Sequence, residues 1–261
     1  MAQDLSSRTA PAPRVALVTG AGQRIGRAIA LALAGAGWDV AVHHRRSRAQ
    51  ALEVADEIRA LGRRAHPIAV DLAEAGQCEA LVDACEDALG PVRCLVNNAS
   101  RFEPDAASDF TAQALDAHMR VNLAAPLWLA RRVHARLPDG GGVVVNLLDQ
   151  KLWNPNPDFF TYTLSKAALE AATGLLARAL APRLRVVGVA PGISLPAAGQ
   201  SQAGFEAAHR ATPLGRASTP QDIAQAVAFL ADAPSITGTT LLVDGGQHLV
   251  PTPRDIMFLK P

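Results

Sequence analysis

The amino-acid sequence predicts an α/β fold, a doubly wound parallel sheet flanked by helices in a single domain. Short apolar runs alternate with longer helical patterns along the chain, which is typical of repeated strand–helix–strand units. Most of these runs are continuously apolar, as expected for a parallel sheet that helices cover on both faces. A length of 261 residues suits one large α/β domain, and an apolar fraction of 49% allows a substantial core.

Each element follows from these patterns in order. Strands are expected at 14–19, 39–44, 65–70, 94–98, 142–148, 184–190 and 240–244. Helices are expected at about 24–35, 48–61, 75–89, 112–136, 159–181 and 220–232. Thr219, Pro220 and Asp222 indicate where the last helix starts, with Thr219 as its cap. The long irregular segment 191–218 is predicted to be a lid or a binding loop.

The two ends of the chain lie outside this pattern. Residues 1–12 are predicted to be a flexible tail, because Asp4 comes early and no apolar stretch of a signal peptide follows. Residues 13–261 then form the single domain. The segment after the last strand, 251–261, is a candidate for contact with a neighbouring subunit. No apolar run approaches the length of a membrane span.

Composition argues against several classes of function. A net charge of +1 gives no reason to expect a nucleic-acid or anionic-membrane partner. Cys78 and Cys85 are seven residues apart in a helical pattern, so buried thiols are expected. Reduced thiols suit the cytosol, and we predict a cytoplasmic protein. The seven histidines form no HExxH pattern, so no metal site is expected.

A glycine-rich turn, TGAGQRIG at 19–26, follows the first strand. Gly20 and Gly22 allow a tight turn and a close approach of the backbone to a pyrophosphate at a helix N-terminus. Glycine turns also join strands to helices for steric reasons alone. The position of this one, between the first strand and an amphipathic helix, favours dinucleotide binding.

The second strand ends in HHRRSR at 43–48, where an NAD-binding chain would carry an acidic residue. The guanidinium groups of Arg45, Arg46 and Arg48 are suited to phosphate oxygens, and Ser47 lies among them. Cations at a helix start oppose the helix dipole, which makes a bound anion more plausible than a solvated basic surface. The sequence therefore favours NADP(H) over NAD(H). Asp71, after the third strand, either accepts from the adenine amino group or caps the next helix.

Tyr162 and Lys166 form a candidate acid–base pair. They are four residues apart on a predicted helix, so both side chains emerge on one face. Tyr162 is the only tyrosine, and lysine occurs only at 151, 166 and 260. A nearby ammonium is expected to lower the pKa of the phenol. The alternative is an ordinary amphipathic helix whose lysine reaches solvent.

From Arg14 to about Leu249 the sequence resembles the short-chain dehydrogenase/reductase family. The motifs are TGAGQRIG, NNAS (97–100), Asn122 in RVNLAAP, YTLSK (162–166), APGIS (190–194) and LLVDGGQ (241–247). The resemblance implies a seven-stranded Rossmann sheet and a homotetramer. It also implies that Tyr162 donates a proton, that Lys166 tunes Tyr162 and binds the nicotinamide ribose, and that Asn122 holds a water in the proton relay.

Two departures from the family pattern point to one branch. Arg24 replaces the middle glycine of the first motif, and Asp149 replaces the catalytic serine. Together with HHRRS and NNASRF, these departures are similar to the pteridine reductases. That resemblance implies that Arg24 reaches towards the phosphates and the substrate. It also implies that Ser100 and Phe102 hold a pterin, with the Phe102 ring stacking it against the nicotinamide.

The chemistry of Asp149 supports this branch. A carbonyl reductase needs a neutral donor on the developing alkoxide, whereas reduction of a pterin C=N bond needs a proton on a ring nitrogen. A carboxyl group beside Tyr162 can pass that proton through the phenol, and Phe102 offers a stacking face worth about 0.5–1.5 kcal/mol. The alternatives are that Asp149 is solvated after strand five and that Phe102 packs on the next helix. Leu152 and Trp153, in the segment 151–160, are expected pocket walls.

We therefore predict an NADPH-dependent pteridine reductase acting on a dihydropterin or dihydrofolate. The alternatives are a carbonyl or alcohol oxidoreductase and a non-catalytic NADPH-binding protein. The predicted catalytic residues are Asp149, Tyr162, Lys166 and Asn122. The predicted substrate residues are Arg24, Ser100, Phe102, Asp149, Tyr162 and Trp153. The predicted cofactor residues are Gly20, Gly22, Arg24, Ile25, His44, Arg45, Arg46, Ser47, Asp71, Leu72, Asn98, Ala99, Ser100, Lys166, Pro191, Gly192 and Ser194.

Overall fold

The sheet of the computed structural model, which describes residues 14–196 and 202–258, has seven parallel strands in the order β3-β2-β1-β4-β5-β6-β7. The strands are β1 (Val15–Val18), β2 (Asp39–His44), β3 (Ala65–Ala69), β4 (Val92–Asn97), β5 (Gly142–Leu147), β6 (Leu184–Pro191) and β7 (Thr240–Val243). The predicted doubly wound, seven-stranded sheet is confirmed, and each strand ends within two residues of its predicted bounds. The predicted tail, 1–12, lies outside the described residues.

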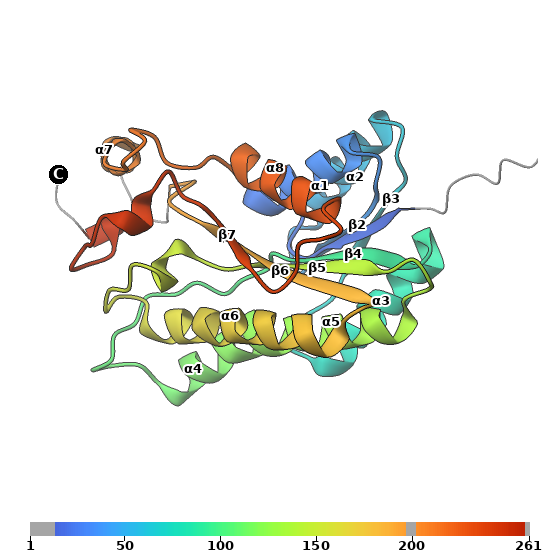
Figure 1. Ribbon diagram of the computed structural model, residues 1–261, viewed down its shortest axis with the longest axis horizontal. Helices are drawn as coiled ribbons and strands as arrows, with labels where there is room; N and C mark the ends of the chain where they lie inside the picture. Colours follow the sequence, from blue (N-terminus) through green and yellow to red (C-terminus); the bar gives the residue numbers. More distant parts are fainter. Residues whose placement is uncertain (1–13, 197–201, 259–261) are drawn as a thin grey trace, which may run out of the picture.

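Helices cover both faces of the sheet (Figure 1). One face carries α1 (Arg24–Gly35), α2 (Arg48–Ala60) and α8 (Pro220–Ala231). The other carries α3 (Ala75–Leu89), α5 (Ala125–Arg136) and α6 (Phe160–Leu180), with α4 (Ala112–Met119) beside α6. Buried aliphatic side chains such as Ile29 and Leu81 fill the two interfaces. Covering both faces explains why most of the strands consist mainly of apolar residues.

The predicted helix 112–136 contains a π-helical turn. After α4, the turn η1 (Arg120–Ala124) leads directly into α5, and the Ala125 N–H bonds to the Arg120 carbonyl five residues back. Such turns are rare and occur often at functional sites. Here the turn carries Asn122, whose side chain is buried.

The last predicted helix start is confirmed in detail. The Thr219 hydroxyl accepts from the Asp222 N–H at 3.2 Å, and the Asp222 carboxylate accepts from the Thr219 N–H at 2.8 Å. The expectation that 191–218 is irregular is wrong in part, because it contains helix α7 (Gln202–Arg210). Helix α7 has only nine residues and lies between stretches with glycine and proline, which favoured a loop in the sequence.

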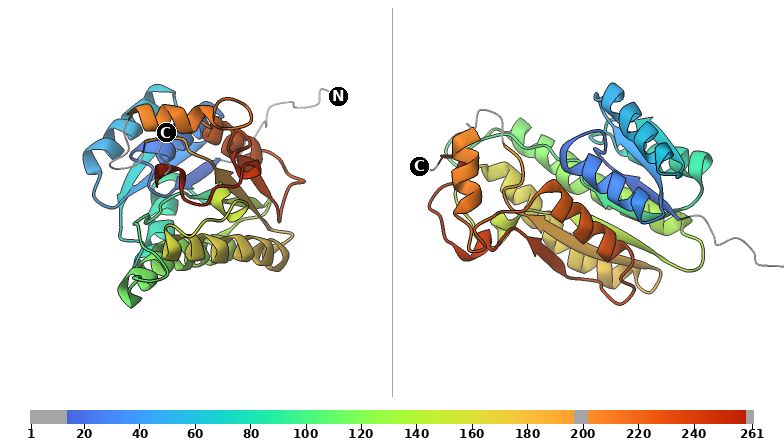
Figure 2. Two further views of the ribbon diagram at one scale, coloured as in Figure 1. Left: turned by 90° about the vertical axis from the view of Figure 1, so that its left-hand side faces the viewer. Right: turned by 90° about the horizontal axis from the view of Figure 1, so that it is seen from above.

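The carboxyl ends of all the strands meet at one edge of the sheet. Helix α7 and the C-terminal residues lie beyond this edge, as the two views of Figure 2 show. After β7 the chain forms two short 3-10 turns, η3 (Gln247–Leu249) and η4 (Ile256–Phe258). No helix in the part of the chain that the structure describes is long and apolar enough to cross a membrane.

Candidate active site

A cavity of about 1270 Å³ opens at the carboxyl edge of the sheet, where β1 and β4 are neighbours and the winding changes direction. Ligands bind at this switch point in doubly wound sheets, and the volume suits a ligand larger than a typical drug-sized molecule. Most of the predicted site residues line it: Gly20, Arg24, Ile25, His44, Arg45, Arg46, Ser47, Asp71, Leu72, Asn98, Ala99, Ser100, Phe102, Asp149, Tyr162, Lys166, Pro191, Gly192 and Ser194. Gly22, Asn122 and Trp153 do not line it.

The glycine turn brings helix α1 close to the first strand. Gly20 has φ +63°, a left-handed conformation that favours glycine. A Cβ on Gly26 would lie 2.2 Å from the Gly20 carbonyl oxygen, so only glycine fits where α1 crosses the turn. Gly22 was expected to face the cavity, but it packs against the start of α2 instead. A Cβ on Gly22 would lie 3.0 Å from the Ser47 hydroxyl.

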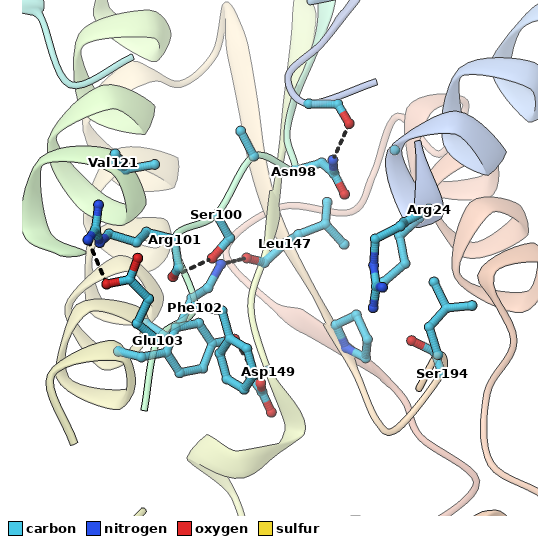
Figure 3. Close-up of a pocket in the computed structure, with 18 of the residues that line it drawn as sticks. Arg24, Asn98, Ser100, Arg101, Phe102, Glu103, Val121, Leu147, Asp149 and Ser194 are labelled. Carbon is cyan, nitrogen blue, oxygen red and sulfur yellow. Dashed lines mark hydrogen bonds and ion pairs between the residues drawn. The ribbon is translucent and has the colours of Figure 1, made fainter. Parts of the chain in front are cut away.

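Asn98 ties the end of β4 to this turn. Its side-chain amide donates to the Thr19 carbonyl at 2.8 Å and to the Gly20 carbonyl at 3.3 Å. The Thr19 hydroxyl accepts from the backbone N–H groups of Asn98 and Ala99 at 2.9 and 3.0 Å. Figure 3 shows Asn98 directed at the turn. These bonds fix the floor of the cavity between β1 and β4.

His43 supports the same turn from β2, a role that the sequence did not reveal. Its Nδ1 accepts from the Gly20 N–H at 3.0 Å, and its Nε2 lies 3.3 Å from the Val70 carbonyl. The neutral ring that donates from Nε2 satisfies both contacts. Burial lowers the pKa of His43 to about 4, in agreement with a neutral ring.

Basic side chains gather where β2 meets α2. Arg45, Arg46 and Ser47 line the cavity. Ser47 stands at the N-cap of α2, and within the described residues its side chain makes no capping hydrogen bond and no acidic residue lies in the first turn. The buried Nδ1 of His44 likewise has no partner among the described residues. Free donors, a helix N-terminus and guanidinium groups together suit a phosphate.

Asp71 uses its carboxylate within the protein. One oxygen accepts from the Ala73 N–H at 3.0 Å, in the turn that leads to α3. The other lies 3.9 Å from the Arg45 guanidinium. Among the described residues α3 begins after Glu74 without a side-chain cap, so the expectation that Asp71 caps this helix is wrong. Asp71 lines the cavity, and binding of an adenine amino group stays a prediction.

Arg24 occupies a backbone position that usually requires glycine. As the first residue of α1 it has φ +54°, a left-handed conformation that costs a non-glycine residue about 1–3 kcal/mol. Its guanidinium Nη2 lies 3.4 Å from the Pro196 carbonyl, and in Figure 3 Arg24 and Ser194 lie across the cavity from Phe102 and Asp149. The strain explains why the family has glycine here, and it implies that the arginine side chain has a use.

Asp149 is hydrogen-bonded to the candidate proton donor. The Tyr162 hydroxyl donates to Asp149 Oδ2 at 2.8 Å, and the Lys151 N–H donates to Asp149 Oδ1 at 2.8 Å. Burial raises the pKa of the Asp149 carboxyl, although both hydrogen bonds oppose the change. The alternative that Asp149 is a solvated loop residue is therefore wrong.

The expected lowering of the Tyr162 pKa is also wrong. Burial, and then the charge and hydrogen bond of Asp149, raise the pKa of Tyr162 well above 10.0. The Lys166 ammonium lies 5.8 Å from the phenol ring and donates to the Leu147 carbonyl at 2.7 Å. Burial lowers the pKa of Lys166 to about 8. Near neutral pH Tyr162 therefore keeps its proton, as a proton donor must.

Asn122 positions the loop after β4 and does not face the cavity. Its Oδ1 accepts from the Arg101 N–H at 2.8 Å and from the Ser100 hydroxyl at 3.2 Å. Its Nδ2 donates to the Arg101 carbonyl and to the Ser165 hydroxyl, both at 2.9 Å. These four contacts occupy both Oδ1 and Nδ2 of the side chain. The role of Asn122 in holding a water of the proton relay therefore stays a prediction.

Phe102 borders Tyr162 and does not pack on the next helix. Its ring stacks on Phe159 with centroids 4.3 Å apart and planes at 18°, and it meets the Tyr162 ring edge-on at 4.6 Å. Phe102 is 45% exposed and lines the cavity, so a ring face remains available there. Phe159 is buried with φ +54°, and no periodic pattern in the sequence marks this contact.

The expectation that Leu152 and Trp153 form a wall of the pocket is wrong. The 3-10 turn η2 (Gln150–Leu152) reverses the chain after Asp149, so that Leu152 packs against the cluster around Leu148. Trp153 lies outside the cavity and is 38% exposed. The wall is formed instead by Phe159 and residues 255–258. Within 14–196 and 202–258, no three His, Cys, Asp or Glu side chains are grouped to hold a metal ion.

Comparison with known proteins agrees with this geometry. The structure of FolM alternative dihydrofolate reductase 1 from Brucella canis, complexed with NADP, is similar with a TM-score of 0.86 and 41% identity, covering 91% of this chain and 95% of that one. An uncharacterized oxidoreductase of Mycobacterium tuberculosis is 38% identical, covering 89% of this chain and 91% of that protein. Pteridine reductase 1 of Leishmania tarentolae is 33% identical, covering 92% and 98%.

A family model described as enoyl-(acyl carrier protein) reductase matches residues 20–248. This match includes the glycine turn from Gly20 onward and helix α6, which carries the Tyr162–Lys166 pair. The similarity to these two relatives covers 89% and 92% of the chain. The chain therefore belongs to the short-chain dehydrogenase/reductase family.

Proposed function

We propose that this protein is an NADPH-dependent pteridine reductase, which reduces a C=N bond of a dihydropterin or dihydrofolate. The observation that carries the proposal is the hydrogen bond between Tyr162 and Asp149 in a cavity that also exposes Phe102. Reduction of a ketone needs only the one proton that the phenol can supply, so it gives the carboxyl group beside Tyr162 no role. A ring nitrogen instead needs a proton, which a carboxyl group can supply through the phenol.

The cofactor is NADP(H). Arg45, Arg46 and Ser47 suit a 2′-phosphate, since guanidinium groups bind phosphate oxygens in a forked geometry. The neighbouring N-terminus of α2 adds backbone donors and a favourable dipole. The similar FolM structure from Brucella canis holds NADP, which supports the same choice here. Bound NADPH supplies the hydride for the reduction.

The protein's own groups would deliver the proton. The Tyr162 hydroxyl would turn from Asp149 to donate its proton to the substrate nitrogen, and the protonated Asp149 carboxyl would then donate one to the phenolate oxygen. The raised pKa of Asp149 favours the protonated form that this step needs. Lys166, charged near neutral pH, stabilises negative charge as it develops on the phenol. Arg24 and Phe102 would hold the heterocycle, Arg24 by its guanidinium and Phe102 by stacking.

The test compares substrates of two classes with purified protein. We expect NADPH oxidation with dihydrobiopterin, dihydromonapterin or dihydrofolate, and little or none with simple ketones. Turnover of ketones without turnover of any pterin would contradict the proposal and favour a general carbonyl reductase. Binding of NADPH without turnover of either class would favour a binding protein.

A further inference from the structure

Residues Arg254–Phe258, here called the C-terminal segment, form one wall of the cavity. Four of them line it: Asp255, Ile256, Met257 and Phe258. The Phe258 ring stacks on Phe159 with centroids 5.8 Å apart and planes at 22°, and Phe159 in turn stacks on Phe102. The segment thus continues the row of rings that ends beside Tyr162.

Charged side chains fasten the C-terminal segment to the loop that precedes α6. The Arg254 guanidinium pairs with the Asp158 carboxylate at 2.7 Å. The same carboxylate accepts from the Asp255 N–H at 2.6 Å. Asp255 in turn places Oδ2 3.2 Å from the Lys151 ammonium. The segment is therefore held by ion pairs as well as by ring contacts.

Lys151 is the residue that connects this segment to the acid–base pair. Its backbone N–H donates to Asp149 Oδ1 at 2.8 Å and so holds the Asp149 carboxyl group in place. Its side chain is only 3% exposed, and its ammonium donates to Asn156 and lies 5.4 Å from the Phe159 ring centroid. A buried ammonium is costly unless a carboxylate pairs with it. Asp255 reaches the Lys151 ammonium when the C-terminal segment lies against the loop before α6.

We propose that Lys151 is a positioning residue of the reductase site, which seats the C-terminal segment as the substrate-binding wall through Asp255 while its backbone holds Asp149 against Tyr162. The inference rests on the proposed pteridine reduction for its kinetic readout. Because the segment lies at the substrate end, beyond Phe102, a loosened wall should weaken binding of the pterin. The NADPH end, formed by β1 and β2, should be unaffected.

The test uses three full-length variants. Lys151→Met removes the charge at nearly constant length, Asp255→Asn leaves the ammonium unpaired, and the double variant removes both charges. Each single change should raise KM for the pterin by about tenfold and leave KM for NADPH within about twofold, and the double variant should show less than the product of the two effects. As the matched control, Arg132→Met breaks the 2.7 Å pair with Asp83 between α5 and α3 and should leave both KM values unchanged.

Hydrogen exchange measures the same contact without turnover. The Asp255 N–H donates to the Asp158 carboxylate at 2.6 Å, and the Met257 and Phe258 N–H groups donate to Asp255 at 3.1 and 2.8 Å. In Lys151→Met these amides should exchange at least about tenfold faster, while the strands keep their protection. Unchanged exchange and an unchanged KM for the pterin would overturn this inference and leave the proposed function intact. If the wild type reduces no pterin but the amides lose protection, the proposed function fails and the positioning role stands.

Discussion

Asp149 shows how one residue changes the chemistry of a familiar site. It stands where the family has a neutral hydroxyl, and it accepts the Tyr162 proton in a hydrogen bond of 2.8 Å. Burial raises the pKa of its carboxyl, so it keeps a proton to a higher pH than an exposed aspartate does. The pair is therefore arranged to supply a proton.

Asp149→Asn should lower the rate of pterin reduction by roughly 10²–10⁴-fold, because the amide keeps the size and the acceptor but cannot carry the proton. In the wild type the rate should fall as the pH rises through the raised pKa of Asp149, and this fall should be absent in the variant. Steady-state rates measured over a pH series test both. A wild-type rate in the variant would show that Asp149 takes no part in proton transfer, provided that NADPH affinity is the same in both proteins.

The single tyrosine makes the pKa of Tyr162 directly measurable. The ultraviolet absorbance of tyrosinate reports this residue alone. In the folded protein the midpoint should lie well above 10.0, since burial and Asp149 both disfavour the phenolate. In Asp149→Asn the midpoint should fall, because the negative charge is gone. A wild-type midpoint below 10 would contradict this account, and the unfolded chain gives the reference value.

Much of the site could be predicted at the residue scale because its residues lie in motifs of fixed spacing. Tyr162 and Lys166 follow from one helical turn, and Gly20 from a turn after a strand. Their electrostatics could not be predicted, because the raised pKa of Tyr162 depends on burial and on Asp149, thirteen residues away. Phe159 was missed for the same reason, since its contacts with Phe102 and Phe258 join three separate segments.

At the scale of elements, strands were easier to predict than the interruptions of helices. Continuous apolar runs located most of the strands, because helices cover both faces of the sheet. The π-helical turn η1 could not be read from the sequence, since residues 112–136 keep a helical pattern through it. The 3-10 turn η2 places Trp153 outside the cavity. This could not be predicted, because the periodicity of a sequence does not specify the direction in which a loop turns.

The packing of α1 on the glycine turn gives a test at this scale. Gly26→Ala should lower the free energy of unfolding by about 1–3 kcal/mol, because the new Cβ would lie 2.2 Å from the Gly20 carbonyl oxygen. NADPH binding should weaken as well, since the turn must move. Gly35→Ala is the matched control in the same helix, because nothing lies within 4 Å of its Cβ. It should be neutral or stabilising by up to about 1 kcal/mol.

Urea unfolding of the two variants measures the difference. Equal midpoints for Gly26→Ala and Gly35→Ala would show that the turn tolerates a side chain. A loss of stability in Gly26→Ala alone would support the close contact between α1 and the turn.

At the scale of the whole molecule, buried His43 should make stability depend on pH. Its pKa is about 4 in the folded chain and 6.5 in the unfolded chain. Stability is therefore full above pH 6.5 and is lost as the pH falls to about 4, because only the unfolded chain takes up this proton. The free energy of unfolding should be lower by roughly 3 kcal/mol once the pH is below about 4.

Urea unfolding over this pH range checks the dependence. His43→Asn keeps an acceptor for the Gly20 N–H and removes the titrating group, so its curve should be flatter. An equal slope in the two proteins would assign the pH dependence to other groups.

The C-terminal segment has a practical consequence for anyone who produces or engineers this protein. Residues 255–258 line the substrate end of the cavity. A bulky group attached to them would crowd the entrance and strain the contacts of Asp255. Strand β1 begins at Val15, at the edge of the sheet opposite to the carboxyl ends of the strands. Surface immobilisation and bulky attachments therefore belong on the side of the sheet where β1 begins, whereas residues 254–258 are the place to randomise when a new substrate range is wanted.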